Sequence, residues 1–235
     1  MAAVSAVVDV AGLRKRFART TALDGVDLTL HAGELVGLIG HNGAGKSTLF
    51  KILSGQLLPG EGSVRVCGHD VSADPAGARG SIGFVPEEPS LWGYLTAREF
   101  LEFVVGVRGG GDIDAALDLA GLGEDCDRLI REYSQGMRRK TALAAALVSR
   151  PPLLLLDEAL NGLDPPSAAR VKAELRARCD DGATVLLSTH VLDTVEKVAD
   201  RVVMMAAGRV IADVRVAEIG PDGLEKMFLG MTRPG

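Results

Sequence analysis

Aromatic residues are scarce in this chain, at 4% of 235 residues, and it has only three cysteines, Cys67, Cys126 and Cys179. So few cysteines, in an odd number, form no disulfide framework, and their spacing matches no metal site; both features fit a reducing compartment. The 26 Lys and Arg residues are outnumbered by 31 Asp and Glu residues, for a net charge of −5. A mildly acidic chain lacks the basic footprint of a nucleic-acid-binding protein, so we expect no nucleic-acid partner.

Long hydrophobic runs are also missing. A membrane-spanning helix needs about 20 consecutive apolar residues, whereas the longest candidates here, 141–148 and 153–156, stop at Arg150 and Asp157. Residues 1–12 carry no basic leader, and we therefore predict no signal peptide. These features predict a cytosolic protein whose membrane role, if any, comes through a partner chain. At 47% apolar and 24% charged residues, the composition is that of a globular domain.

Strand-like patterns occupy the first and last thirds of the chain. Residues 26–30 alternate between apolar and polar, as in a strand with one buried face. Residues 35–39, 153–156 and 184–187 are instead short apolar runs, typical of parallel strands buried on both faces. Residues 202–212 predict a hairpin.

The middle third has helical signals. Thr96–Glu99 is a capping box, Asp112 can cap a second helix that Gly121 ends, and Pro151-Pro152 ends a third. We therefore predict an α/β fold with a mostly parallel sheet, a small N-terminal antiparallel β portion and an inserted helical subdomain.

The strongest motif is GHNGAGKS at residues 40–47, which fits G-x-x-x-x-G-K-[ST]. It follows the apolar run 35–39 and precedes a helical segment, which is the context that this phosphate-binding motif requires. Glycines let successive backbone N–H groups turn toward an anion, and the helix N-terminus adds the positive end of its dipole. Lys46 is placed to reach the β- and γ-phosphates of a nucleotide, and Ser47 to hold Mg²⁺.

Asp157 and Glu158 follow the apolar run 153–156. A carboxylate at the end of a strand beside the phosphate loop can hold Mg²⁺, a role that we assign to Asp157, and Glu158 can polarise an attacking water. Apolar runs that end in Asp-Glu are common strand ends, so the pair gains significance only from the phosphate loop.

These motifs resemble the ATP-binding subunit of an ABC transporter, and the resemblance covers about residues 4–230. Further elements follow in the family's order: Phe17 at the adenine-stacking position, FVPEE (84–88) at the Q-loop, YSQGM (133–137) at the signature motif, NGLD (161–164) at the D-loop, and His190 as the switch histidine. The fold implied is a P-loop ATPase core with the β portion and helical subdomain described above.

The resemblance also implies roles for individual residues. Glu158, His190 and Lys46 would be catalytic, and Mg²⁺ would be held by Ser47, Asp157 and Glu87. Contacts to ATP would come from Phe17, Gly40, His41, Asn42, Gly43, Ala44, Gly45, Lys46, Ser47, Thr48, Glu87, Ser134, Gly136 and Asp164.

Several of these residues have plainer interpretations. Phe17 can be ordinary core, His190 a core or capping histidine, and Asp164 the start of a turn at Pro165. Ser134 can simply cap the helix that follows it. For Ser134 the two interpretations agree, because a capped helix N-terminus beside Gly136 is itself suited to bind phosphate.

The chain departs from the family pattern at some positions. Glu87 replaces the Gln of the Q-loop, Gln135 and Met137 replace a Gly and a Gln of the signature, and Ala159-Leu160 replaces Pro-Thr or Pro-Phe. The last change removes a stiff residue beside Glu158. Pro-Glu-Glu together with Ser-x-Gly-Met resembles the export-type subclass, which works with separate permease chains.

The resemblance implies that two such subunits close head to tail over two ATP molecules. One would supply the phosphate loop, Asp157, Glu158 and His190, and the other Ser134, Gly136 and Asp164. The sequence leaves open whether the pair is a homodimer or a heterodimer. The function implied is ATP hydrolysis that powers export through a transmembrane permease, at the cytoplasmic face of the cell membrane. A soluble ABC ATPase without transport and a regulatory ATP sensor without turnover are the alternatives.

We predict one domain over 1–235. Residues 1–88 and 151–215 would form the ATPase core, 89–150 the helical subdomain and 216–235 a C-terminal tail. Trp92 and Tyr94, between the Q-loop and the helical segment, either dock a helix of the permease or pack under the helical lobe.

Overall fold

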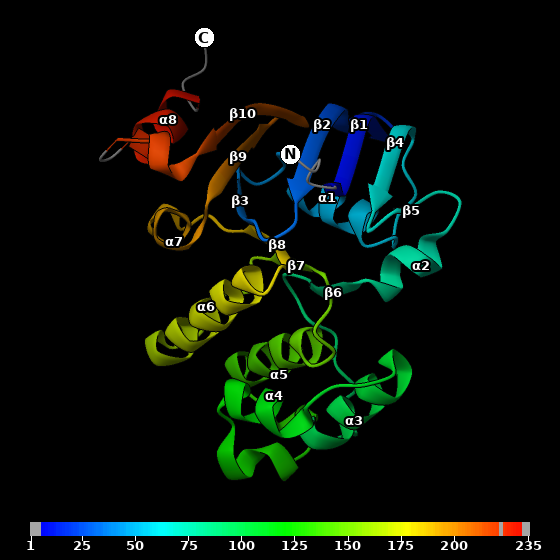
Figure 1. The fold of residues 1–235 in the computed structure, drawn as a ribbon, viewed down its shortest axis with the longest axis vertical. Coiled ribbons are helices and arrows are strands. Elements are labelled where there is room, and N and C mark those ends of the chain that lie inside the picture. Colours follow the sequence, from blue (N-terminus) through cyan, green and yellow to red (C-terminus); the bar gives the residue numbers. More distant parts are fainter. Residues whose placement is uncertain (1–5, 221–222, 232–235) are drawn as a thin grey trace.

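The computed structural model describes residues 6–220 and 223–231 (Figure 1). Residues 1–5, 221–222 and 232–235 lie outside this part. The first of these ranges belongs to the N-terminus for which we predict no signal peptide, and the other two belong to the predicted tail. Within the described residues, none of the helices combines the length and hydropathy that crossing a membrane requires.

Strands and helices alternate along much of the chain. In chain order the described elements are β1 (Ala6–Phe17), β2 (Thr20–His31), β3 (Leu35–Ile39), α1 (Lys46–Leu53), β4 (Glu61–Val66), β5 (His69–Asp70), α2 (Pro75–Gly80), β6 (Ile82–Val85), α3 (Ala97–Arg108), α4 (Ile113–Ala120), the 3₁₀ turns η1 (Gly123–Asp127) and η2 (Ile130–Glu132), α5 (Gln135–Leu147), β7 (Leu153–Asp157), α6 (Pro165–Asp180), β8 (Thr184–Ser188), α7 (Leu192–Val198), β9 (Arg201–Ala206), β10 (Arg209–Arg215), η3 (Val216–Glu218) and α8 (Gly223–Met231).

The described strands form two sheets. A six-stranded sheet has the order β10-β9-β3-β8-β7-β6; β9, β3, β8, β7 and β6 run parallel, and β10 pairs with β9 as an antiparallel hairpin. A four-stranded antiparallel sheet has the order β2-β1-β4-β5. The predicted α/β class, with a mostly parallel sheet and an N-terminal antiparallel part, is confirmed.

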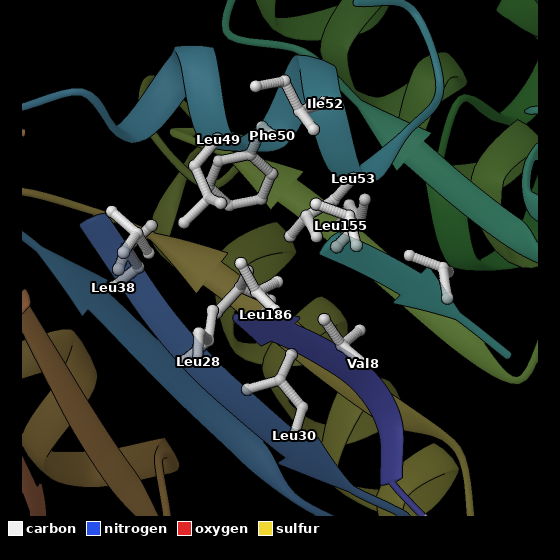
Figure 2. Close-up of a cluster of buried hydrophobic side chains, with 14 of the residues drawn as sticks. Val8, Leu28, Leu30, Leu38, Leu49, Phe50, Ile52, Leu53, Leu155 and Leu186 are labelled. Carbon is white, nitrogen blue, oxygen red and sulfur yellow. The ribbon is translucent and has the colours of Figure 1, made fainter. Parts of the chain in front are cut away.

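The parallel strands are buried on both faces, as their apolar runs predict. In β3, Val36 and Leu38 belong to one hydrophobic cluster, whereas Leu35 and Ile39 belong to another on the opposite face. The first cluster fills the space between the two sheets and α1, whose apolar side chains meet strands of both sheets (Figure 2). This packing fixes the N-terminus of α1 at the carboxyl end of β3, where the phosphate loop lies.

The helical subdomain has a hydrophobic cluster of its own, formed by α3, α4, the 3₁₀ turns and α5. These helices lie together at the end of the molecule away from the antiparallel sheet (Figure 1). The predicted capping box at Thr96 and Glu99 is present, with both of its hydrogen bonds, and Asp112 caps α4. The helical insertion is therefore confirmed, and its boundaries at 89 and 150 remain predictions.

The segment predicted as a C-terminal tail contains η3 and α8. Leu224 of α8 is fully buried, and Met227 and Phe228 pack against the cluster on the helical face of the parallel sheet. Phe228 also lies against His41 of the phosphate loop, with ring centroids 4.7 Å apart. The described part of this segment thus adds to the core and touches the phosphate loop.

Candidate nucleotide site

The phosphate loop (residues 40–47) depends on backbone conformations that favour glycine. Gly43 and Gly45 have φ angles of 82° and 104°, in the left-handed region. A Cβ on Gly45 would come within 2.6 Å of the carbonyl oxygen of Ala22, and one on Gly40 within 2.4 Å of that of Met205. Glycine is therefore required at both positions by close backbone packing, and the loop curls directly into the N-terminus of α1.

Lys46 begins α1 and is buried. Its Nζ donates hydrogen bonds to the carbonyl oxygens of Gly40, at 2.5 Å, and His41, at 3.3 Å. These contacts hold the ammonium group inside the loop. A buried cation surrounded by inward-turned backbone at a helix N-terminus is suited to bind phosphate groups.

Asp157 ends β7, beside β8, and its side chain is almost fully buried. Its Oδ1 accepts a hydrogen bond of 2.6 Å from the Ser188 hydroxyl. The same hydroxyl oxygen accepts a bond of 2.9 Å from the backbone N–H of Glu158. Ser188 therefore fixes both carboxylate residues from the neighbouring strand.

Glu158 has a φ of 51°, a left-handed conformation that is unusual for a residue other than glycine. Such a conformation costs roughly 1–3 kcal/mol and persists where the surroundings impose it. Here the Glu158 N–H is bonded to both the carbonyl oxygen and the hydroxyl of Ser188. The turn aims the Glu158 carboxylate away from the strand direction and into the site.

Two polar side chains contact the Glu158 carboxylate. Its Oε2 lies 2.6 Å from Nδ2 of Asn161 and 3.1 Å from Nδ1 of His190. His190 is largely exposed, so its imidazole reaches the carboxylate from the solvent side. The structure thus pairs the predicted base with the predicted switch histidine.

One cavity of about 400 Å³ brings together most of the residues that one subunit is predicted to supply to its own nucleotide. Its walls come from the phosphate loop and α1, from β2, from the Q-loop (residues 84–88) and from the end of β7. It is lined by Thr20, Thr21, Ala22, His41, Asn42, Gly43, Ala44, Gly45, Lys46, Ser47, Thr48, Glu87, Asp157 and Glu158.

Phe17 does not line this cavity. It ends β1, pairs with Thr20 of the cavity wall across the β1–β2 hairpin, and has about half of its surface exposed. Lys15 places its Nζ 5.6 Å from the centre of the Phe17 ring. An exposed ring beside the cavity differs from ordinary core, and adenine stacking by Phe17 remains a proposal.

The residues expected to act on the second subunit's nucleotide lie outside the cavity. Ser134 caps α5 through a hydrogen bond of 3.3 Å from the backbone N–H of Met137 to its hydroxyl. Gly136 lies close to the D-loop (residues 161–164), because a Cβ added to it would be 3.6 Å from the carbonyl oxygen of Gly162. The signature segment (133–137) and the D-loop are therefore neighbours in this chain.

Asp164 caps α6 and is paired with Lys140 of α5, whose Nζ lies 2.7 Å from Oδ2. The hydrogen bond from Lys140, together with those from the backbone and hydroxyl of Ser167, holds the pKa of Asp164 well below its usual range. Asp164 is thus both the predicted helix start and a fixed negative charge beside the signature helix.

Glu87 lines the phosphate-loop cavity and also a second cavity of about 550 Å³ between the Q-loop and α5. Arg139 of α5 lines the second cavity and donates to the carbonyl oxygen of Glu87, at 2.6 Å, and to that of Asn161. A single guanidinium group therefore links the Q-loop and the D-loop to the helical subdomain.

The family model described as ABC transporter matches residues 23–161. This match covers more than half of the chain and contains the phosphate loop, the Q-loop, the signature segment and both carboxylates. The chain belongs to this family. Its P-loop α/β fold and its identity as an ATP-binding, ATP-hydrolysing domain of ABC type are thereby confirmed.

Two curated ABC relatives illustrate the similarity. A daunorubicin/doxorubicin resistance ATP-binding protein from Streptomyces peucetius is 40% identical, over 90% of this chain and 66% of its own length. A Nod factor export ATP-binding protein from Rhizobium sp. (strain N33) is 37% identical, over 95% of this chain and 74% of its own. This chain thus spans about two thirds to three quarters of these relatives.

Solved ABC structures are similar over nearly the whole chain. An ATP-binding subunit of an ABC transporter superposes with a TM-score of 0.90 at 29% identity, covering 97% of this chain and all of that one. A dimeric, post-hydrolysis ATP-binding cassette bound to ADP and Pi has a TM-score of 0.82 at 25% identity, covering 89% of this chain and 98% of that one.

Sequence reasoning did not find several residues of the site. Ser188 could have been found, because it ends the apolar run 184–187 next to the switch histidine. The cavity wall at Thr20–Ala22 depends on how the two sheets meet, and the contacts of Asn161 and Arg139 depend on loop geometry; neither leaves a local signal in the sequence.

Proposed function

We propose that this chain binds Mg-ATP in the phosphate-loop cavity and hydrolyses it to power export through a separate transmembrane permease. The observation that carries the proposal is the cavity itself, which joins a curled, cation-containing phosphate loop to two carboxylates at the end of the adjacent sheet. Such a combination suits a nucleoside triphosphate with its metal ion.

Each residue at the cavity has a defined role in this proposal. Lys46 neutralises the β- and γ-phosphates, and the oxygens of Ser47 and Asp157 are suitable ligands for the Mg²⁺ that accompanies ATP. Glu87 adds a third oxygen donor from the Q-loop. Phe17, beside the cavity, stacks on the adenine ring.

Glu158 acts as the general base. It takes a proton from the attacking water while the water oxygen forms a bond to the γ-phosphorus, and the bond from that phosphorus to the bridging oxygen of ADP breaks. His190, which contacts the Glu158 carboxylate, orients the water and the γ-phosphate. The products are ADP and inorganic phosphate.

The signature segment and the D-loop act on a second subunit. Ser134, at the capped start of α5, presents its hydroxyl and the adjacent backbone N–H groups, a combination suited to the γ-phosphate of the facing nucleotide. Because Ser134, Gly136 and Asp164 do not line this chain's own cavity, a head-to-tail pair explains their placement. The dimeric cassette among the similar structures supports such a pair.

The permease would dock beside the helical subdomain. A cavity of about 470 Å³ between the Q-loop and α3 has an apolar wall that includes Leu91, Phe103 and Val107. Trp92 packs on Phe103 at 4.5 Å between ring centroids and is half exposed, and Tyr94 is 83% exposed. An apolar groove with the half-exposed ring of Trp92 beside it suits an amphipathic helix of a partner. The chain would then lie peripherally at the cytoplasmic face of the membrane.

The direction of transport is inferred from the relatives. Those named above are a drug-resistance protein and a Nod factor export protein, and both retain most of this chain's length in their alignments. Export therefore accounts better for this chain than an ATPase uncoupled from transport.

The proposal is tested by measuring ATP hydrolysis by the full chain, alone and with its co-purified permease in detergent. We expect Mg²⁺-dependent turnover that Lys46→Ala abolishes, and stimulation by the permease. Turnover that is unchanged in Lys46→Ala would contradict the site, and the absence of any associated membrane protein would favour the soluble ATPase.

A further inference from the structure

The loop that follows the predicted base is held in one conformation. Its backbone turns back at Asn161, whose N–H donates to the carbonyl oxygen of Glu158 at 3.1 Å. Ala159 and Leu160, the two residues between Glu158 and Asn161, are buried and anchor the loop to the core. The turn brings the side chain of Asn161 back to that of Glu158.

The contact between these side chains has a defined polarity. An ionised carboxylate only accepts hydrogen bonds, so the Asn161 amide must present its NH₂ group, through Nδ2, to Oε2 of Glu158 at 2.6 Å. His190 approaches the same oxygen, at 3.1 Å, with Nδ1. Both donors act on Oε2, which leaves Oε1 to accept the proton from water.

We propose that Asn161 is a positioning residue for the catalytic carboxylate: its amide holds Oε2 of Glu158 so that Oε1 faces the attacking water. The proposal rests on the proposed function and deepens it.

Asn161 is itself held from the helical subdomain. Arg139 donates to its carbonyl oxygen and, through the other guanidinium nitrogen, to the carbonyl oxygen of Glu87. The position of Asn161 therefore depends on α5 and on the Q-loop as well as on β7. A displacement of the helical subdomain would move the Asn161 amide relative to Glu158, and so couple that displacement to the geometry of the base.

Two substitutions separate this role from simple packing. Asn161→Ala removes the donor, and we expect kcat to fall about tenfold or more, because misplacing a reacting group by about 1 Å can cost that much. Asn161→Asp keeps the size and shape but replaces the donor with a second carboxylate facing Glu158, so its kcat should fall further than that of the Ala variant. KM for ATP should stay within about twofold in both variants, since Asn161 does not line the phosphate-loop cavity.

The experiment measures kcat, KM and ATP-induced dimer formation for the full-length wild type and both variants, with melting curves as a check on folding. Retained dimer formation with reduced kcat supports the proposal. An Asp variant more active than the Ala variant would show that shape alone matters, and Ala turnover within twofold of wild type would also overturn it. If the Ala variant is unstable, the near-isosteric Asp variant decides: wild-type turnover by it overturns the proposal. Wild-type protein without Lys46-dependent hydrolysis would instead overturn the proposed function.

Discussion

Glu158 combines a backbone conformation that a glutamate ordinarily avoids with a side chain held by two neighbours. The strained φ is imposed by Ser188, whose carbonyl and hydroxyl oxygens both accept from the Glu158 N–H. Strain of this kind typically accumulates where a reacting group must be aimed. Ser188 of the neighbouring strand β8 therefore determines how the catalytic carboxylate is oriented.

Replacing Glu158 with Gln tests the base directly. Gln keeps the size and the hydrogen-bonding capacity but takes up no proton, so we expect hydrolysis to fall by roughly 10²-fold or more. ATP binding should persist, and the ATP-bound dimer should accumulate because it no longer turns over. Turnover assays and size-exclusion chromatography with ATP measure both effects; near-normal turnover would show that Glu158 is not the base.

Asp164 predicts a dependence of stability on pH. Because Lys140 and Ser167 lower its pKa in the folded chain, the stabilisation is complete above the unfolded pKa of about 3.9 and is lost as the pH falls through the lower, folded pKa. Asp164→Asn keeps a good helix cap but removes the charge. Its melting temperature should therefore lie below that of wild type at pH 7, with a difference that shrinks below about pH 4.

Melting curves between pH 7 and pH 2 check this expectation. In a Lys140→Met background the same substitution should cost less at neutral pH, because the main partner of the carboxylate is gone. A difference between wild type and Asp164→Asn that stays constant down to pH 2 would assign the effect to capping and not to charge.

At this scale the sequence predicted residues by type and spacing, and it could not predict the contacts between them. Lys46, Ser47 and Asp157 follow motifs whose geometry is local, and all of them line one cavity. Asn161 meets Glu158 only because the loop turns back on itself, and Arg139 meets the D-loop only because α5 packs beside it. Contacts of this kind depend on tertiary packing, which no local pattern encodes.

Among the helices, the N-termini of α1 and α5 have different roles in nucleotide binding. The N-cap of α1 is Gly45, which makes no side-chain cap, so the helix presents backbone N–H groups and Lys46. The N-cap of α5 is Ser134, whose hydroxyl accepts from Met137. The first terminus lines the phosphate-loop cavity, whereas the residues of the second do not, which fits sites assembled from two chains.

Paired substitutions at the two termini test this division. Lys46→Ala should abolish ATP binding by the monomer, because it removes the cation inside the loop. Ser134→Arg should leave monomer binding intact and block ATP-driven dimerisation, because its bulk lies at the facing surface. Equilibrium binding of a fluorescent ATP analogue and size-exclusion chromatography give the two measurements. If Ser134→Arg weakens monomer binding as much as Lys46→Ala does, the two-chain site is wrong.

Prediction of the elements succeeded where the apolar pattern was strong. The buried runs became β3, β7 and β8, and the capping signals at Thr96 and Asp112 mark the starts of α3 and α4. Helix α2 was missed, since it has six residues and only one buried side chain, which leaves no periodic pattern. The sequence predicts a tail where helix α8 lies, because the burial of α8 depends on packing against elements far away in the sequence.

In the molecule as a whole, the parallel sheet that positions the phosphate loop is packed on both faces. One face packs on α1 and the antiparallel sheet, and the other on α5, α6, α7 and α8. The helical subdomain adds a separate hydrophobic cluster, and the apolar groove lies between this subdomain and the Q-loop. Groove residues of α3 such as Phe103 and Val107 belong to neither cluster that flanks the parallel sheet, so partner binding can be altered there without disturbing the core around the nucleotide.

Trp92 provides the test at this scale. Its exposed fraction is 52%, and its ring packs against those of Phe100 and Phe103, so Trp92 is half-buried against α3 and not enclosed under the helical lobe. Trp92→Ala should therefore cost well below the ~3–5 kcal/mol that truncating a buried Trp costs. ATP binding by the chain alone should be unchanged, whereas assembly with the permease should weaken, because aromatic residues dominate contact centres.

Leu58 offers a matched control, since it is 53% exposed and lies in the loop after α1, outside the groove. Leu58→Ala should change neither ATP binding nor assembly. Melting curves and pull-downs from detergent, made on both variants and on wild type, separate stability from docking. A Trp92→Ala protein that is sharply destabilised would contradict the docking surface. So would a Trp92→Ala protein that assembles with the permease as well as Leu58→Ala does, since Trp92 would then only cover Phe103 and would not contact the partner.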